Sequence, residues 1–307
     1  MKQQKKVILV AGPTASGKSK LAIKLAKHLN GEIINADSMQ IYREISILTS
    51  KPSHRDRKII KHHLYGFKSV KKKFSTGLWL KMVIKKIEKQ WKDGKIPIVV
   101  GGTGLYFKAL TDGLVNIPNI PDNFRKKVRF LHKKLGQKKF FEQLIKIDFL
   151  SKKYISPSDS QRSMRAYEVK KFTNKSLFKF IKQTKSNFQK DVFIKLFINI
   201  PKDLLYKKIE KRVEIMFKEG AIEEVKNFLK IKINKDLSSK KIIGIKEIDN
   251  YLNGKIKLIK AKELIRQKTR QYAKRQFTWA RGHMKSWEMI YSYDLNDLFK
   301  KAINKIS

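Results

Sequence analysis

The chain has 307 residues, in which 72 lysines and arginines outnumber 26 acidic residues and give a formal net charge of +46. It contains no cysteine, which excludes disulfides, a thiolate nucleophile and a cysteine-based zinc site. The charge favours a polyanionic partner such as nucleic acid, although a genome rich in A and T would also enrich lysine. No apolar run reaches the length of a signal sequence or a membrane-spanning helix, so we expect a cytoplasmic protein.

A buried strand is predicted at residues 7–11, and a glycine-rich loop follows it directly. Residues 12–19 read Gly-Pro-Thr-Ala-Ser-Gly-Lys-Ser, a complete G-x-x-x-x-G-K-[ST] phosphate loop, and a helix is expected from Leu21 onward. The glycines let the backbone amides turn toward an anion, Lys18 supplies a positive charge, and the hydroxyl of Ser19 can bind Mg²⁺. The loop predicts binding of a diphosphate or triphosphate and does not say which one.

Two further predicted strands also end in polar loops. Residues 32–36 form the second strand and are followed by Asp37, and residues 96–100 form another strand, after which Thr103 lies in a glycine-flanked turn. Working residues gather at the carboxyl ends of parallel strands, so Asp37 is a candidate base or Mg²⁺ ligand. Thr103 could bind a substrate phosphate or orient Asp37. The alternatives are a helix cap for Asp37 and an ordinary turn residue for Thr103.

The pattern then changes to a helical, strongly basic segment without a buried strand, before a β-type run returns at residues 193–200. A helical stretch follows at residues 202–230, with a break at 218–220, and a long helix is predicted at residues 257–281. We predict an α/β fold with a P-loop NTPase-like parallel-sheet core, formed by residues 1–117 and 190–307, and a helical insertion domain at residues 118–189.

The few arginines are more informative than the many lysines. In the insertion, Arg162 and Arg165 are three residues apart and share a helix face, which suits phosphates or base edges. The alternative is that they pair with Glu168 inside the fold. The last helix interleaves arginines with aromatic residues, a pattern that suits RNA, unless the aromatic residues belong to the core and the cations to the surface. The adjacent His62 and His63 do not form a metal-type cluster.

Seven segments, in this order, resemble the bacterial tRNA dimethylallyltransferases over nearly the whole chain. They are the phosphate loop at 12–19, Asp37-Ser-Met-Gln40 with Tyr42, Lys51-Pro52, His62-His63-Leu64, Gly101-Gly-Thr-Gly-Leu-Tyr-Phe107, Gln161-Arg-Ser-Met-Arg165 and Thr269-Arg-Gln-Tyr-Ala-Lys-Arg-Gln276. Many kinases share the phosphate loop alone, whereas its combination with the Asp37 and Gly101 motifs is far more specific.

The resemblance implies transfer of a dimethylallyl group from dimethylallyl diphosphate to N6 of the adenosine adjacent, on the 3′ side, to the tRNA anticodon. It implies Mg²⁺ as the ion and the tRNA anticodon arm as the macromolecular substrate, and we infer no protein partner and no membrane. The roles that it implies are catalytic for Asp37, as general base, and for Thr103 and Lys18; diphosphate binding for Gly12, Pro13, Thr14, Ala15, Ser16, Gly17, Lys18, Ser19 and Arg212; and tRNA binding for Asp37, Ser38, Met39, Gln40, Thr103, Arg125, Gln161, Arg162, Ser163, Met164 and Arg165.

The chain also departs from the family pattern. It has Gly244-Ile245-Lys246-Glu247 where the family commonly has Gly-Tyr-Arg-Glu, and Leu48-Thr49-Ser50-Lys51-Pro52 where the family often has Gly-Thr-Ala-Lys-Pro. Two other functions remain open at this point. A small-molecule kinase would use the same loop for ATP but would leave the basic insertion without a role, and an RNA-binding P-loop protein would perform no prenyl transfer.

Overall fold

The structure is a computed structural model, and it describes residues 5–234, 237–292 and 294–306. The chain divides into two compact units, one made of residues 1–111 with 188–307 and the other of residues 112–187. Within the described ranges, no helix is long and apolar enough to cross a membrane.

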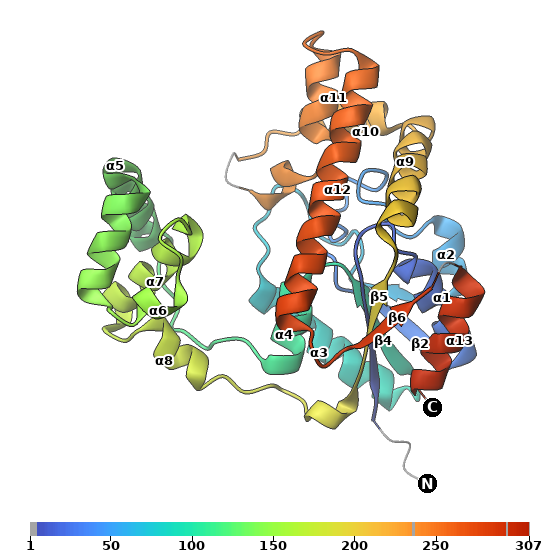
Figure 1. Ribbon diagram of the computed structural model, residues 1–307, viewed down its shortest axis with the longest axis horizontal. Helices are drawn as coiled ribbons and strands as arrows, with labels where there is room; N and C mark the ends of the chain where they lie inside the picture. The colour runs from blue at the N-terminus through green and yellow to red at the C-terminus, as the bar shows by residue number, and fades with distance from the viewer. Residues whose placement is uncertain (1–4, 235–236, 293, 307) are drawn as a thin grey trace. The chain divides into compact units, whose positions relative to one another are not determined.

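The first unit is built on a six-stranded parallel sheet with the strand order β3-β2-β4-β1-β5-β6 (Figure 1). Both faces of its central strands are covered, so these strands are almost continuously apolar rather than alternating. The strands are β1 (Val7–Ala11), β2 (Gly31–Asn35), β3 (His62–His63), β4 (Ile96–Gly101), β5 (Phe193–Asn199) and β6 (Glu288–Tyr291).

Two layers of helices bury the sheet. The helices α1 (Lys18–His28) and α13 (Leu295–Ile306) pack on one face, and α3 (Thr76–Lys92) and α4 (Gly104–Asp112) pack on the other. The short helix α2 (His54–Ile59) begins with a capping box at Ser53. In β1, Ala11 pairs with Gly101 of β4 and with Phe197 of β5. The loops that follow these strands therefore meet at one edge of the sheet.

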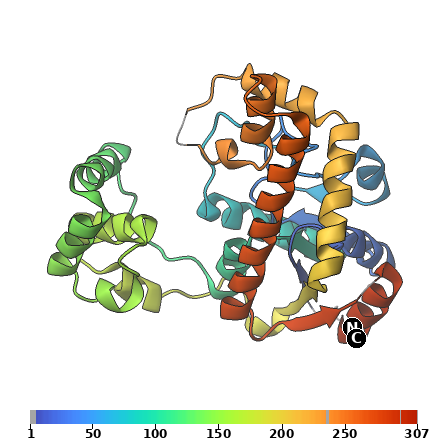
Figure 2. The same ribbon diagram turned by 45° about the horizontal axis from the view of Figure 1, so that its top comes forward.

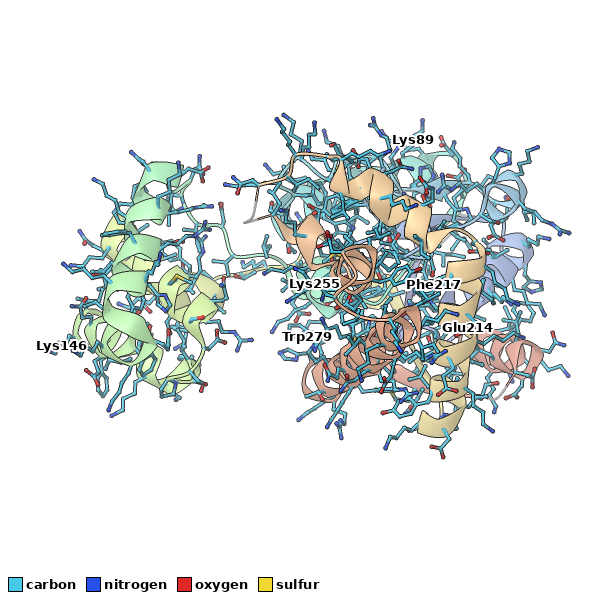
Figure 3. The ribbon with its side chains drawn as sticks, turned by 90° about the horizontal axis from the view of Figure 1, so that it is seen from above. Lys89, Lys146, Glu214, Phe217, Lys255 and Trp279 are labelled. Carbon is cyan, nitrogen blue, oxygen red and sulfur yellow. The ribbon has the colours of Figure 1, made fainter. Side chains whose placement is uncertain are left out.

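A helical layer lies over that edge. It contains α9 (Lys202–Lys218), α10 (Ala221–Leu229), α11 (Ile245–Leu252) and α12 (Leu258–His283), together with a 3₁₀ turn at Ser238–Lys241, while a second 3₁₀ turn at Lys190–Val192 leads into β5. Both views show α12 running alongside α9 (Figures 1 and 2). The two helices are joined by ion pairs, because Glu214 of α9 binds Lys262 and Arg266 of α12 and Glu210 of α9 binds Arg270. Figure 3 labels Glu214 on α9 and Trp279 on α12 in a view from above.

The second unit is entirely helical in its regular structure. It contains α5 (Asp122–Ile147), α6 (Ser151–Tyr154), α7 (Ser160–Thr173) and α8 (Leu177–Lys182). Gly136, with a φ of 73°, kinks α5 because the backbone there is not helical. A small core formed by Phe141, Leu144, Ile155 and Ala166 holds these helices together.

The parallel sheet and its P-loop position are confirmed, as is the break between α9 and α10. Five elements were absent from the sequence interpretation: α2, β3, β6, α11 and α13. The sixth strand has only four residues, of which one is buried, so it carries too little apolar pattern to be recognised. His62 and His63 form the short edge strand β3, and no group of three or more candidate metal ligands occurs among the described residues.

Candidate active site

The phosphate loop connects β1 to the first turn of α1. Gly17 caps the helix with a φ of +94°, which only glycine adopts without strain, and Ala15 also has a positive φ of 63°. The ammonium group of Lys18 donates a hydrogen bond to the Pro13 carbonyl at 3.0 Å, so the side chain folds back over the loop. The Ser16 hydroxyl is buried and has no hydrogen-bond partner among the described residues, as expected for a donor that serves a bound anion.

The ammonium group of Lys18 is partly withdrawn from solvent, near one acidic and one basic side chain. Burial lowers its pKa to about 8, the nearby Asp37 carboxylate acts in the opposite direction, and Arg212 lowers it further. Its ammonium form therefore still predominates at neutral pH. A bound diphosphate would stabilise that charge, because an anion beside an ammonium group favours the protonated form.

Arg212 approaches the loop from α9. Its guanidinium donates to the Thr14 hydroxyl at 2.7 Å, and the pKa of Arg212 is lowered by burial, with Asp37 acting in the opposite direction. Its Nε is buried with no partner in the described part of the chain. The structure thus brings Arg212 to the phosphate loop, where it can bind phosphate oxygens beside Lys18.

Asp37 follows β2, and the preceding Asn35 shapes its loop. The Asn35 side chain accepts from the Asp37 amide at 2.8 Å and donates to the Asp37 carbonyl at 3.0 Å, while Trp79 donates to the Asn35 carbonyl. Asp37 Oδ1 accepts the Met39 amide at 2.9 Å within a turn; no helix begins there in the described chain, so the helix-cap alternative is wrong. Oδ2 accepts no hydrogen bond from the described residues, so one carboxylate oxygen is available to a substrate.

Thr103 lies beside this loop because β4 neighbours β2. Its hydroxyl accepts the Ser38 amide at 2.9 Å and donates to the Ser38 hydroxyl at 3.3 Å. A side chain at Gly101 would place its Cβ 2.1 Å from the Ala36 carbonyl oxygen, so only glycine permits this approach. Thr103 therefore orients the Asp37 loop, one of the two roles expected for it.

Two cavities open on these groups. One, of about 260 Å³, is lined by Thr14, Asp37 and Arg212 and by an apolar wall that includes Leu48, Val213, Met216, Ile242 and Ile265. The other, of about 210 Å³, is lined by Gly12, Ser38 and Thr103 and by Trp279 of α12. Tyr272 and Arg275 of α12 line both cavities, so these two side chains lie at the boundary between them.

Tyr272 and Gln276 were not among the predicted site residues. Burial and the Asp37 carboxylate raise the pKa of Tyr272, so its phenol stays protonated and can donate a hydrogen bond. Gln276 contacts the phosphate loop from 262 residues further along the chain. Both belong to the 269–276 motif that carries part of the family resemblance, and this motif could have identified them from the sequence. Phe277 of the same helix packs in the core, whereas the pairing of Arg266 and Arg270 with acids of α9 makes these two cations structural.

Gln40 and the two segments that depart from the family pattern, residues 48–52 and 244–247, lie at or against one loop, residues 46–50. The Gln40 amide donates to the Thr49 and Ser50 carbonyls at 2.9 Å, so Gln40 holds this loop in place. Gly244, with a φ of +105°, packs against the Leu48 side chain, whose Cδ2 would lie 2.8 Å from an added Cβ. The departures are therefore local: Ile245 is buried in the helical layer and Lys246 is exposed.

In the second unit, the predicted tRNA-binding residues differ in exposure. Gln161 and Arg162 are exposed, and Arg162 pairs with Asp159 at 3.1 Å. Arg165 lies 3.4 Å from Glu168, which is the internal pairing considered as the alternative. Ser163 is fully buried and donates to the Asp159 carbonyl, so it supports the start of α7 from inside. Elsewhere in this unit, Met164 is partly buried, and the Nε of Arg125 is buried without a partner among the described residues.

The residues around the phosphate loop fit Mg²⁺ in the way that this ion usually binds. Mg²⁺ takes one or two protein oxygens and completes its shell with water and substrate phosphates, so it needs no dedicated cluster of carboxylates. Ser19 lies at the start of α1, next to Lys18, and its hydroxyl can serve as one such oxygen. The Asp37 carboxylate is the nearby acidic group.

The sequence and the fold both match known proteins. The model of the IPP transferase family matches residues 40–283. The tRNA dimethylallyltransferase of Pelagibacter ubique is 54% identical over 301 residues, covering 98% of this chain and 96% of the relative, and that of Rickettsia massiliae is 42% identical, covering 99% and 84%.

Solved structures agree with these matches. The full-length tRNA isopentenylpyrophosphate transferase of Bacillus halodurans superposes with a TM-score of 0.71 at 31% identity, covering 98% of this chain and 95% of that structure. A eukaryotic dimethylallyltransferase acting on tRNA superposes with a TM-score of 0.85 at 28% identity, covering 98% and 77%. These matches support the prenyltransferase interpretation and do not support the kinase alternative. The chain belongs to the IPP transferase family.

Proposed function

We propose that this protein transfers the dimethylallyl group of dimethylallyl diphosphate to N6 of the adenosine next to the tRNA anticodon, on its 3′ side. The observation that carries the proposal is the 260 Å³ cavity, because it combines phosphate-loop and cationic groups, a carboxylate and an apolar wall. A phosphoryl-transfer enzyme needs the first of these, whereas a five-carbon allylic donor needs the apolar wall as well.

The diphosphate binds to the phosphate loop. As the allylic C–O bond breaks, the electron pair leaves with the diphosphate and negative charge grows on its oxygens. The loop amides of Ala15, Gly17, Lys18 and Ser19, the Lys18 ammonium and Arg212 stabilise that charge. Mg²⁺ bound through Ser19 would supply further positive charge to the same oxygens.

Asp37 serves the other half of the reaction. N6 of adenine is a weak nucleophile, so the new C–N bond requires loss of an N6 proton, and Asp37 Oδ2 is the free acceptor in the cavity. The fixed Asn35 and Thr103 contacts hold the Asp37 loop in one geometry before the substrate arrives. This preorganisation supplies the close positioning on which transfer between two bound substrates depends.

RNA binding belongs to the basic surface of both units. A target base in a folded anticodon arm is stacked and must be extruded to reach the cavity, which requires protein contacts away from the reacting atom. Arg125, Gln161, Arg162 and Arg165 of the second unit are proposed to make such contacts with the anticodon arm. The expected place of this reaction is the cytoplasm, where its tRNA substrate is found.

One assay distinguishes the candidate functions. The protein is incubated with Mg²⁺ and unmodified tRNA, first with radiolabelled dimethylallyl diphosphate and then with ATP labelled at the γ-phosphate. We expect label in the RNA only with the prenyl donor, and we expect digestion of that RNA to release N6-dimethylallyladenosine. Transfer of phosphate, or tight tRNA binding with no transfer of either label, would contradict the proposal.

A further inference from the structure

Gln276 of α12 connects the two loops on which the proposed reaction depends. Its side chain is almost fully buried, with 8% exposure. Its Oε1 accepts the backbone amide of Thr14 in the phosphate loop at 2.9 Å, and its Nε2 donates to the Gly102 carbonyl at 2.9 Å. One side chain thus spans from the diphosphate cradle to the loop that carries Thr103.

Gly102 provides the space for this bridge. A Cβ at Gly102 would lie 2.1 Å from Gln276 Nε2, so any side chain there would displace the amide. The backbone of Gly102 is outside the left-handed region, which means that its conformation does not itself demand glycine. Close approach of Gln276 is therefore the reason that a side chain does not fit.

The bridge needs an amide in particular. The Thr14 N–H requires an acceptor and the Gly102 carbonyl requires a donor, and the two ends of glutamine supply one of each. Glutamate would place a second acceptor against the carbonyl, and methionine would fill similar space while making neither hydrogen bond. Thr14 is also held through its hydroxyl by Arg212, so Gln276 fixes the same residue from the opposite helix of the α9–α12 pair.

We propose that Gln276 is a positioning residue that sets the spacing between the phosphate loop and the Gly101–Gly104 loop. This inference rests on the proposed function, in which the first loop holds the donor diphosphate and the second orients the Asp37 loop toward the acceptor. The distance between the allylic carbon and N6 then depends on the bridge. A misplacement of about 1 Å can reduce the rate of such a reaction by about 100-fold.

The first test compares Gln276→Met and Gln276→Glu with Gln271→Met, which changes an exposed glutamine of the same helix. We expect both Gln276 variants to lose about 10- to 100-fold in single-turnover rate at saturating tRNA and donor. Their affinity for inorganic diphosphate, measured by calorimetry without tRNA, should stay within about threefold, because the rest of the phosphate loop is unchanged. Gln271→Met should resemble the wild type in both measurements. A merely structural role would instead lower the melting temperature of the Gln276 variants and leave the single-turnover rate of the folded enzyme unchanged, which would overturn the inference.

The second test is a double-mutant cycle with Gly102→Ala. That change pushes the Gln276 amide away, so it breaks the same bridge from the other side. The Gly102→Ala, Gln276→Ala double variant should be no slower than the slower single variant, whereas multiplication of the two losses would show that the residues act independently and would overturn the inference.

Amide hydrogen exchange at Thr14 separates this inference from the proposed function. The Thr14 amide should exchange faster in Gln276→Met than in the wild type, whether or not the wild type transfers a prenyl group. If exchange is faster in the variant but the wild type transfers no prenyl group, the hydrogen-bonded bridge is supported and only the proposed reaction is wrong. Unchanged exchange would contradict the bridge itself.

Discussion

Single residues set the chemistry of this site through contacts that leave particular atoms free. Asp37 has one carboxylate oxygen bound by the Met39 amide and the other free of the described chain, so it is both fixed and available. Ser16 and Arg212 likewise present buried donors without partners in the described protein. A site with unsatisfied donors around a phosphate loop and one free acceptor suits a reaction that stabilises an anion and removes a proton.

Lys18→Ala is expected to remove nearly all turnover. The variant loses the ammonium that faces the leaving diphosphate, at a cost of about 2–4 kcal/mol in transition-state stabilisation. The measurement is kcat/KM for dimethylallyl diphosphate at fixed tRNA. A variant with the wild-type value would exclude Lys18 from the leaving-group site.

Asp37→Asn is expected to reduce the chemical step and to leave tRNA affinity within about threefold. The change keeps the size of the side chain and removes its basicity, which is needed in the transition state more than in the bound ground state. Single-turnover rates and filter binding of tRNA measure the two quantities separately. If tRNA affinity falls strongly while the rate at saturation survives, Asp37 is a binding residue rather than a base.

Lys51 gives a pH dependence of stability. Burial lowers its pKa from 10.5 to about 8, and its ammonium donates to the Tyr42 and Arg43 carbonyls. Between these pH values the unfolded chain binds more protons at this position than the folded chain, so this residue makes the free energy of unfolding rise with pH from about 8 to 10.5. We would measure the free energy of unfolding in urea for the wild type and for Lys51→Met at pH 7.5 and pH 10. Between the two pH values, the stability of the wild type should increase relative to that of the variant. An equal difference at both pH values would contradict the lowered pKa.

At the level of elements, α10 and α12 organise loops that lie far from them in sequence. Glu224 of α10 accepts the consecutive amides of Ser46, Ile47 and Leu48 at 2.6, 2.8 and 3.0 Å. One carboxylate thereby satisfies three backbone donors of a loop that has no strand or helix of its own. Leu48 and Thr49 of this loop line the 260 Å³ cavity, so the position of α10 determines one wall of that cavity.

Glu224→Ala is expected to lower the free energy of unfolding by about 2–3 kcal/mol, since hydrogen bonds to a charged group are lost and three amides remain unpaired. It should also raise KM for tRNA, because Gln40 is held by the carbonyls of the same loop. Glu223 is the matched control, because it is exposed and pairs only with Lys226 among the described residues. Its substitution removes the same charge from the same helix. Glu223→Ala should change stability by less than about 0.5 kcal/mol. Equal effects of the two variants would show that charge, rather than the loop contacts, is responsible.

At the level of the whole molecule, the proposed function places the chemistry and part of the RNA recognition in different units. The groups proposed to bind the diphosphate and to accept the proton lie in the first unit, whereas Arg162 and Arg165 lie in the second. A net charge of +46 attracts RNA without selecting a site, and defined contacts must supply the selection. Arg162 pairs at the surface with Asp159 and Arg165 with Glu168, so both cations would exchange a protein partner for phosphate on binding.

The double variant Arg162→Ala with Arg165→Ala tests that division of roles. If both side chains bind phosphates, the slope of log affinity for tRNA against log salt should become shallower by about one unit for each lost contact. Affinity for dimethylallyl diphosphate in the absence of tRNA should be unchanged, because its site lies in the first unit. A purely structural role predicts a lower melting temperature with an unchanged salt slope, and that result would remove this helix face from the proposed tRNA contacts.

The sequence by itself determined the parts of the protein that are encoded locally. The phosphate loop needs only its own glycines, lysine and serine between a strand and a helix, and the positions of Asp37 and Thr103 follow from the ends of their strands. The break between α9 and α10 is likewise predicted by the Lys-Glu-Gly segment at residues 218–220. Only the tertiary structure brought Gln276 and Arg212 to Thr14 and Glu224 to residues 46–48, across separations of 176 to 262 residues. It also decided which cations pair with acids inside the protein and which remain available, because pairing depends on how α9 packs on α12 and carries no local sequence signal.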